Sequence, residues 1–153
     1  MSSKTNIATL HHEQGYGCAQ PVLAAFAGDY VSSEEQALKP ATGFGSGMGG
    51  LCEVWGALTS AFRVPRSKYG RAECDGTNYR TKTETPYTPI HAFASRFKER
   101  NFGIYCGVLA GPDLNNPEQR ERAKREGVLA TTCSQCVQDV TELVAELLEV
   151  ETP

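Results

Sequence analysis

Apolar residues recur at helical spacing in several segments of the chain, and no segment alternates apolar and polar residues as a half-buried strand would. We therefore expect an all-α fold, a compact bundle of about five to six helices. The patterns place these helices over about 18–31, 32–44, 51–64, 90–103, 117–126 and 133–150.

A glycine-rich segment, GFGSGMGG at 43–50, precedes the central helix of this predicted bundle. Leu51, Trp55 and Leu58 follow it at helical spacing, and no helix breaker occurs before Pro65. The sequence thus predicts a glycine-rich turn and then a central helix that starts near residue 51.

Two segments have a polar composition that favours irregular structure. Residues 65–89 are rich in Thr, Gly and Pro, which predicts a long polar loop. Residues 1–15 read as a polar lead-in, in which the adjacent His11 and His12 form an exposed pair. Residues 1–153 are expected to form a single domain.

The composition excludes several classes of partner. The chain has 153 residues and a net charge of −3, which gives no reason to expect nucleic-acid binding. Its apolar runs are too short for membrane insertion. The N-terminal residues lack the basic and apolar regions of a signal peptide, so a cytoplasmic location is expected.

The six cysteines are the main candidates for chemistry, because in a reducing compartment cysteines are more often ligands or redox thiols than structural disulfides. Backbone N–H groups at a helix start favour a thiolate, and thiolates bind soft metals and iron–sulfur clusters. Cys74 lies in the polar loop and is expected to be a bystander. The other five lie at predicted helix starts, namely Cys18, Cys52, Cys106, Cys133 and Cys136.

Other interpretations of the cysteines stay open at this stage. They could be small buried hydrophobes, or could hold a structural zinc ion, although the spacing matches no zinc finger. Cys133 and Cys136 form a CxxC pair that could serve a thiol–disulfide protein. No βαβ pattern surrounds this pair, so a thioredoxin-like fold is not expected.

Several pieces of the chain together resemble a known family. They are GCAQPVLAAFA at 17–27, TGFGSGMG at 42–49, WGALTSA at 55–61, KYG at 68–70, FASRFKERNFGIYCGVLAG at 93–111 and the terminal segment CSQCVQDVTELVAELL. In order and spacing they resemble the C_GCAxxG_C_C proteins, which are described as redox-active and whose pattern is also associated with split-Soret cytochromes.

The resemblance implies four cysteines, at Cys18, at the position of Trp55, at Cys106 and at Cys133. The characteristic Cys-Gly-Ala-x-x-Gly therefore starts with Trp55 here and ends with Ser60. The resemblance implies an electron-transfer or accessory protein that binds an iron–sulfur cluster, works with a redox partner protein and forms a homodimer.

The fourth ligand is the open question in this reading. Cys52 precedes Trp55 by one helical turn of the predicted central helix, so we expect it to replace the missing thiol. Cys136 is the alternative. The expected ligands are thus Cys18, Cys52, Cys106 and Cys133 or Cys136, with the Trp55 indole shielding them from water.

Overall fold

The computed structural model describes residues 2–30, 33–69, 79–111 and 113–150, and its regular elements there are helical. This confirms the prediction of an all-α fold. The longer helices are α1 (Ser3–Glu13), α2 (Ala19–Tyr30), α3 (Glu34–Ala41), α5 (Gly56–Tyr69), α6 (Tyr79–Asn101), α8 (Pro117–Arg125) and α9 (Ser134–Val150). Shorter elements are η1 (Thr42–Phe44), α4 (Gly45–Met48), α7 (Cys106–Leu109) and η2 (Leu129–Cys133).

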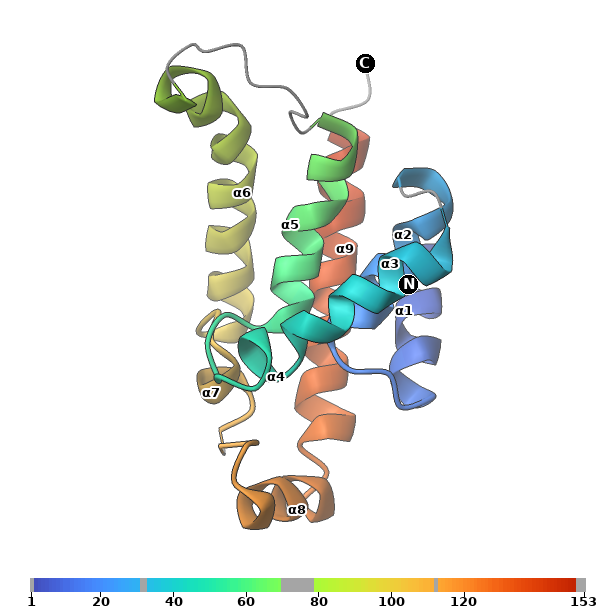
Figure 1. Cartoon of the computed structure of the whole chain (residues 1–153), viewed down its shortest axis with the longest axis vertical. Coiled ribbons are helices and arrows are strands. Elements are labelled where there is room, and N and C mark those ends of the chain that lie inside the picture. The colour runs from blue at the N-terminus through green and yellow to red at the C-terminus, as the bar shows by residue number, and fades with distance from the viewer. Residues whose placement is uncertain (1, 31–32, 70–78, 112, 151–153) are drawn as a thin grey trace.

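The core lies between α2, α5 and α9, which pack against one another in the middle of the molecule. α1 packs on α2 and α9, whereas α6 packs on the other side of α9 and α5 (Figure 1). Trp55, Leu58, Phe97 and Leu143 are at most 1% exposed and form part of this core. Burial of such side chains supplies most of the free energy that holds short helices together.

The N-terminal segment is a helix, so the prediction of a polar lead-in at 1–15 is wrong. Ser2 caps α1 by accepting a hydrogen bond from the Thr5 backbone N–H at 3.2 Å. Thr5 and Ala8 are completely buried on the inner face of the helix. These side chains are small and partly polar, and they allow close helix packing without producing an apolar stripe in the sequence.

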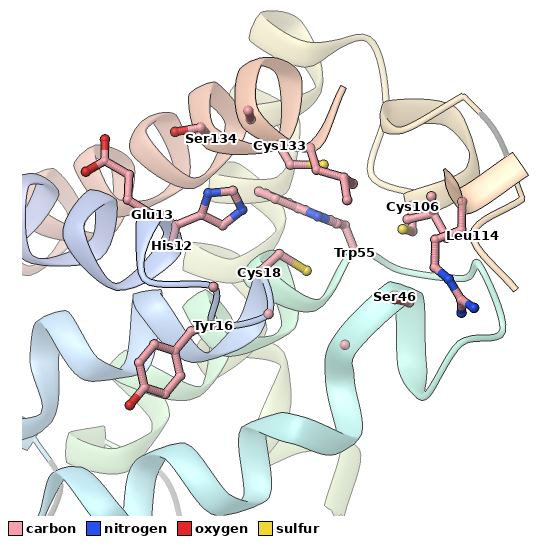
Figure 2. A pocket seen from close by; sticks show the side chains of 16 residues that line it. His12, Glu13, Tyr16, Cys18, Ser46, Trp55, Cys106, Leu114, Cys133 and Ser134 are labelled. Atoms are coloured by element: carbon pink, nitrogen blue, oxygen red, sulfur yellow. The ribbon is translucent and has the colours of Figure 1, made fainter. Parts of the chain in front are cut away.

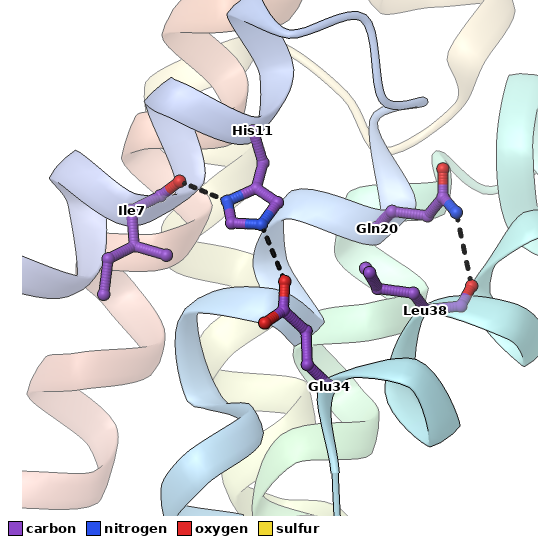
Figure 3. A network of polar contacts seen from close by, with 5 residues as sticks. All are labelled: Ile7, His11, Gln20, Glu34 and Leu38. Atoms are coloured by element: carbon purple, nitrogen blue, oxygen red, sulfur yellow. Dashed lines mark hydrogen bonds and ion pairs between the residues drawn. The ribbon is translucent and has the colours of Figure 1, made fainter.

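The two adjacent histidines of α1 are half-buried and not an exposed pair. His11 joins α1 to α3, because its Nδ1 lies 2.9 Å from the Ile7 carbonyl oxygen and its Nε2 lies 2.9 Å from Glu34 Oε1 (Figure 3). Nearby, the Gln20 side chain donates to the Leu38 carbonyl oxygen at 3.3 Å and links α2 to α3.

The central helix α5 begins at Gly56, five residues later than predicted from the apolar spacing. Residues 53–55 pair instead with residues 104–106, since the Trp55 N–H donates to the Ile104 carbonyl at 2.8 Å. The Cys106 N–H likewise donates to the Glu53 carbonyl at 2.8 Å. Residues about fifty positions away in the sequence thus form the hydrogen bonds that an earlier helix start would need. The predicted glycine-rich turn before the helix is confirmed.

The long loop predicted at 65–89 is wrong over much of its length. α5 continues through Pro65 to Tyr69, and α6 already begins at Tyr79. Pro65 removes one helical hydrogen bond but is itself buried, so packing holds the helix together there. The C-terminal half of α6 packs Phe93 and Phe97 on the core. The helix extends from there toward its N-terminus, because adding turns to a formed helix costs little free energy. Cys74 lies outside the described residues.

A group of exposed apolar side chains lies on the glycine-rich segment and on the segment from the end of α6 through α7. Backbone hydrogen bonds join these two segments, for example from the Gly107 N–H to the Cys52 carbonyl. We call this group the apolar patch; it consists of Met48, Leu51, Phe102, Tyr105 and Val108. Among the helices described, none has the length and apolar character needed to cross a membrane.

Candidate functional site

Three cysteines from distant parts of the chain line one cavity of about 630 Å³. They are Cys18, Cys106 and Cys133, and Figure 2 shows their side chains around the same space as the Trp55 indole. The rest of the wall comes mainly from the turn between α1 and α2, the glycine-rich segment and η2. We call this space the cysteine cavity.

Cys18 lies directly before α2 and is half-buried. Burial raises the pKa of its thiol, whereas the backbone N–H groups of Ser46, Gly56 and Ala57 act in the opposite direction and lower the pKa. The last two N–H groups belong to the start of α5, where backbone donors are free to bind an anion. The helix that would stabilise a Cys18 thiolate is therefore α5 and not the helix that Cys18 precedes.

Cys106 opens α7 and is held against the glycine-rich segment. A Cβ atom added to Gly47 would lie 2.8 Å from the Cys106 Cβ and 2.7 Å from the Glu53 backbone, so only glycine fits at this position. Ser46 and Met48 on either side also have left-handed backbone conformations, with φ of 52° and 64°. Such conformations cost about 1–3 kcal/mol each and often occur at functional sites.

Cys133 is the last residue of η2 and lies immediately before α9. Burial, followed by the nearby Cys18, Cys106 and Cys136, raises its pKa to about 12. Burial, Cys18 and Cys52 raise the pKa of Cys106 to about 12 as well. The prediction that helix starts favour thiolates at these cysteines is wrong for the metal-free protein, because desolvation outweighs the backbone dipoles.

The remaining two described cysteines do not line the cysteine cavity. Cys52 is not on the central helix; its backbone is left-handed, with φ of 58°, and its Sγ lies 3.4 Å from Asp113 Oδ1. The Asn115 side-chain amide donates to the same sulfur at 3.7 Å. Cys136 is buried, and its thiol donates to Asn101 Oδ1 at 3.3 Å. The roles of Cys52 and Cys136 as ligands remain predictions.

Trp55 forms part of the cavity wall and of the core at the same time. It is 1% exposed, and its ring stacks on Phe97 with 5.8 Å between centroids. Ser60, one turn further along α5, is completely buried and its hydroxyl has no hydrogen-bond partner among the described residues. The indole thus excludes water from the side of the cavity that it lines.

His12 is a cavity residue that the sequence interpretation missed. It lines the cysteine cavity from the last turn of α1, and burial lowers the pKa of its imidazole despite the opposing charge of Glu13. The spacing of Thr5, Ala8 and His12 puts all three on one helix face, and this was the available signal. It was overlooked because only Ala8 in this set is apolar.

The donors around the cavity are spread around its wall and do not converge on one point. Among the described residues, no group of three or more His, Cys, Asp or Glu side chains could hold a single metal ion. A tetrahedral zinc ion needs four ligands that converge within about 2.0–2.3 Å of one centre. Three thiols nevertheless line the wall of this one cavity.

Comparison with known proteins identifies one kind of relative. The family model described as "Putative redox-active protein (C_GCAxxG_C_C)" matches residues 16–147. Neither the curated proteins nor the solved structures gave a match. The matched range contains Cys18, Cys106 and Cys133 of the cysteine cavity together with Trp55.

Proposed function

The chain belongs to the C_GCAxxG_C_C family of redox-active proteins, and from this premise we propose that it transfers electrons through an iron–sulfur cluster held in the cysteine cavity. One observation carries the proposal. The sequence resemblance assigns four cysteine positions to this chain, at Cys18, Trp55, Cys106 and Cys133, and all four line the same cavity. These positions are far apart in the sequence, so their meeting supports a shared ligand.

The donor set fits this kind of group. Cys18, Cys106 and Cys133 would hold the cluster, since thiolates are the usual ligands of iron–sulfur centres. When bound, a cluster of this kind supplies one-electron transfer at a potential set by its type, charge, hydrogen bonds and exposure to solvent. The electron donor or acceptor would be a redox partner protein.

The residues around the thiols would support the charge of a bound cluster. The backbone N–H groups of Gly56 and Ala57 face Cys18 and partly offset the negative charge of its thiolate. Trp55, whose ring stacks on Phe97, closes one side of the cavity with an apolar wall, which limits the access of water and oxidants. The thiols keep their protons in the metal-free protein and would release them when they bind a metal.

The two alternative interpretations receive less support. A structural zinc ion requires ligands around one centre, and no such group exists among the described residues. A thiol–disulfide enzyme requires an accessible thiolate with a lowered pKa. Cys133 and Cys136 of the CxxC pair are both buried, and burial raises their pKa values to about 12 and about 11.

Iron and sulfide analysis of protein purified without oxygen tests this proposal. We expect stoichiometric iron and sulfide and a broad visible absorption band in the wild type. In Cys18→Ser the iron content should fall at least about tenfold, because even outer-shell partners typically change metal affinity by 10–100-fold.

The matched control is Cys52→Ser, because Cys52 faces Asp113 and lies outside the cavity wall, and a serine hydroxyl can donate to the same carboxylate. This variant should keep its iron. A colourless, iron-free wild type from an iron-replete preparation would contradict the proposal, and so would full iron content in Cys18→Ser. Equal iron loss in the two variants would instead make Cys52 a further ligand.

A further inference from the structure

The cysteine cavity contains three thiols where the family pattern has four, because an indole occupies the remaining position. Trp55 offers no metal-binding atom, so a cluster in this chain lacks one protein thiolate. Cys52 and Cys136 do not line the cavity, and their sulfurs lie against Asp113 and Asn101 respectively. Some other donor, or solvent, must complete the coordination.

We propose that His12 is the fourth ligand of the cluster, a nitrogen donor from α1 in place of the missing cysteine. This inference rests on the proposed function. His12 lines the cysteine cavity together with Cys18, Cys106 and Cys133. Figure 2 shows its ring directed toward the space that the Trp55 indole and the Cys18 and Cys133 side chains also face.

The ring nitrogens of His12 are free to bind a metal. No hydrogen bond joins them to any side chain or backbone group among the described residues, although the ring is half-buried. His11, its neighbour, has both ring nitrogens engaged, by the Ile7 carbonyl and by Glu34. The two histidines thus differ in the one property that a ligand requires, which is an available nitrogen lone pair.

Its chemistry also distinguishes His12 from the other polar groups on the wall. Neutral imidazole is the commonest metal ligand among protein side chains. The other possible donors on the wall, Glu13, Tyr16, Ser46 and Ser134, offer oxygen atoms. Imidazole suits iron, whereas carboxylate and hydroxyl oxygens suit harder ions such as Mg²⁺ and Ca²⁺.

Histidine ligation has a measurable consequence for the redox potential. Replacing thiolate by neutral imidazole removes negative charge from the ligand set, and in known iron–sulfur centres this raises the potential. The His12→Cys variant would restore an all-cysteine set. Its cluster should therefore have a lower reduction potential than the wild-type cluster.

Pulsed electron paramagnetic resonance of the anaerobically iron-loaded full-length protein, in its oxidised and reduced states, tests the assignment. We expect ¹⁴N hyperfine coupling in the wild type and in the control His11→Gln. The coupling should be absent from His12→Gln and from His12→Cys, while His12→Cys keeps its iron and shifts to a lower potential.

The outcomes separate this inference from the proposed function. A wild type that contains iron and sulfide but shows no nitrogen coupling would overturn His12 as a ligand and leave the cluster proposal intact. Nitrogen coupling that persists in His12→Cys would do the same. A wild type without iron would overturn the proposed function and the His12 assignment together.

Discussion

Replacing Gly56 by alanine should destabilise the protein through a contact next to the cysteine cavity. A Cβ atom at this position would lie 2.3 Å from the Phe44 carbonyl oxygen, 2.9 Å from the Phe44 carbonyl carbon and 3.1 Å from the Ala19 Cβ. Two of these atoms belong to the backbone, which cannot rotate away as the end of a side chain can. Either η1 or the start of α5 must therefore move.

The size of the effect follows from two opposing contributions. Overpacking of this kind costs about 1–3 kcal/mol, and more where backbone must shift. The gain in helix propensity from glycine to alanine is at most about 1 kcal/mol. Gly56 is the first residue of α5, so this gain is small, and the clash is with backbone. We therefore expect the free energy of unfolding to fall by roughly 1–3 kcal/mol.

Gly28→Ala provides the matched control. Gly28 lies inside α2, is exposed, and would have nothing within 4 Å of an added Cβ. This variant should be more stable than the wild type by about 0.5–1 kcal/mol. Urea unfolding of the metal-free proteins measures both differences. If Gly56→Ala proved as stable as Gly28→Ala, the close packing of Phe44 and Ala19 on α5 would be refuted.

Three further predictions concern the thiols, Trp55 and self-association. The metal-free protein should lose stability as the pH rises above about 8.5, the ordinary pKa of a cysteine. Above this pH the unfolded chain releases thiol protons, whereas the folded protein retains those of Cys106 and Cys133 up to about pH 12. The thermal midpoint should therefore fall less with pH in Cys106→Ala than in the wild type, and an identical fall would show that this thiol is not responsible. Trp55→Cys should bind iron in its folded fraction without nitrogen coupling, because the new thiol takes the place of His12. Urea unfolding should show a loss of about 3–5 kcal/mol of stability. Continued nitrogen coupling would show that the new thiol does not reach the cluster. The apolar patch predicts a homodimer. Sedimentation at low micromolar concentration should detect the dimer in the wild type and show weaker association in Leu51→Ser. A monomeric wild type would contradict this prediction.

The sequence predicted those helices whose ends or faces carry a local signal. α8 begins with proline after the Asn116 cap, and α9 has an apolar stripe of Val137, Val140 and Val144, so both were found near their observed bounds. The six predicted helices all exist, but α1 is a further long helix among the described residues, so the predicted total of five to six helices is too low. α1 was missed because its buried face consists of Thr5, Ala8 and neighbouring polar residues, which produce no hydrophobic period.

The errors around the site have a common physical cause, which is pairing between segments distant in the sequence. The start of α5 depends on hydrogen bonds from Trp55 to Ile104 and from Cys106 to Glu53, and no local pattern encodes them. The position of Cys52 was wrong for the same reason. Three cavity cysteines were found because their residue type carries the chemistry, whereas His12 became a candidate only when α1 was seen beside the cavity.

The number of iron atoms held together in the cysteine cavity distinguishes a cluster from a single metal ion. X-ray absorption at the iron edge of the anaerobically purified wild type measures it through scattering from neighbouring atoms. An iron–sulfur cluster in this cavity should give iron–sulfur scattering from thiolate and sulfide together with an iron–iron vector, which only a polynuclear cluster produces. A metal surrounded by sulfur without any metal–metal vector, as in a single tetrahedral zinc or iron site, would contradict the proposed cluster.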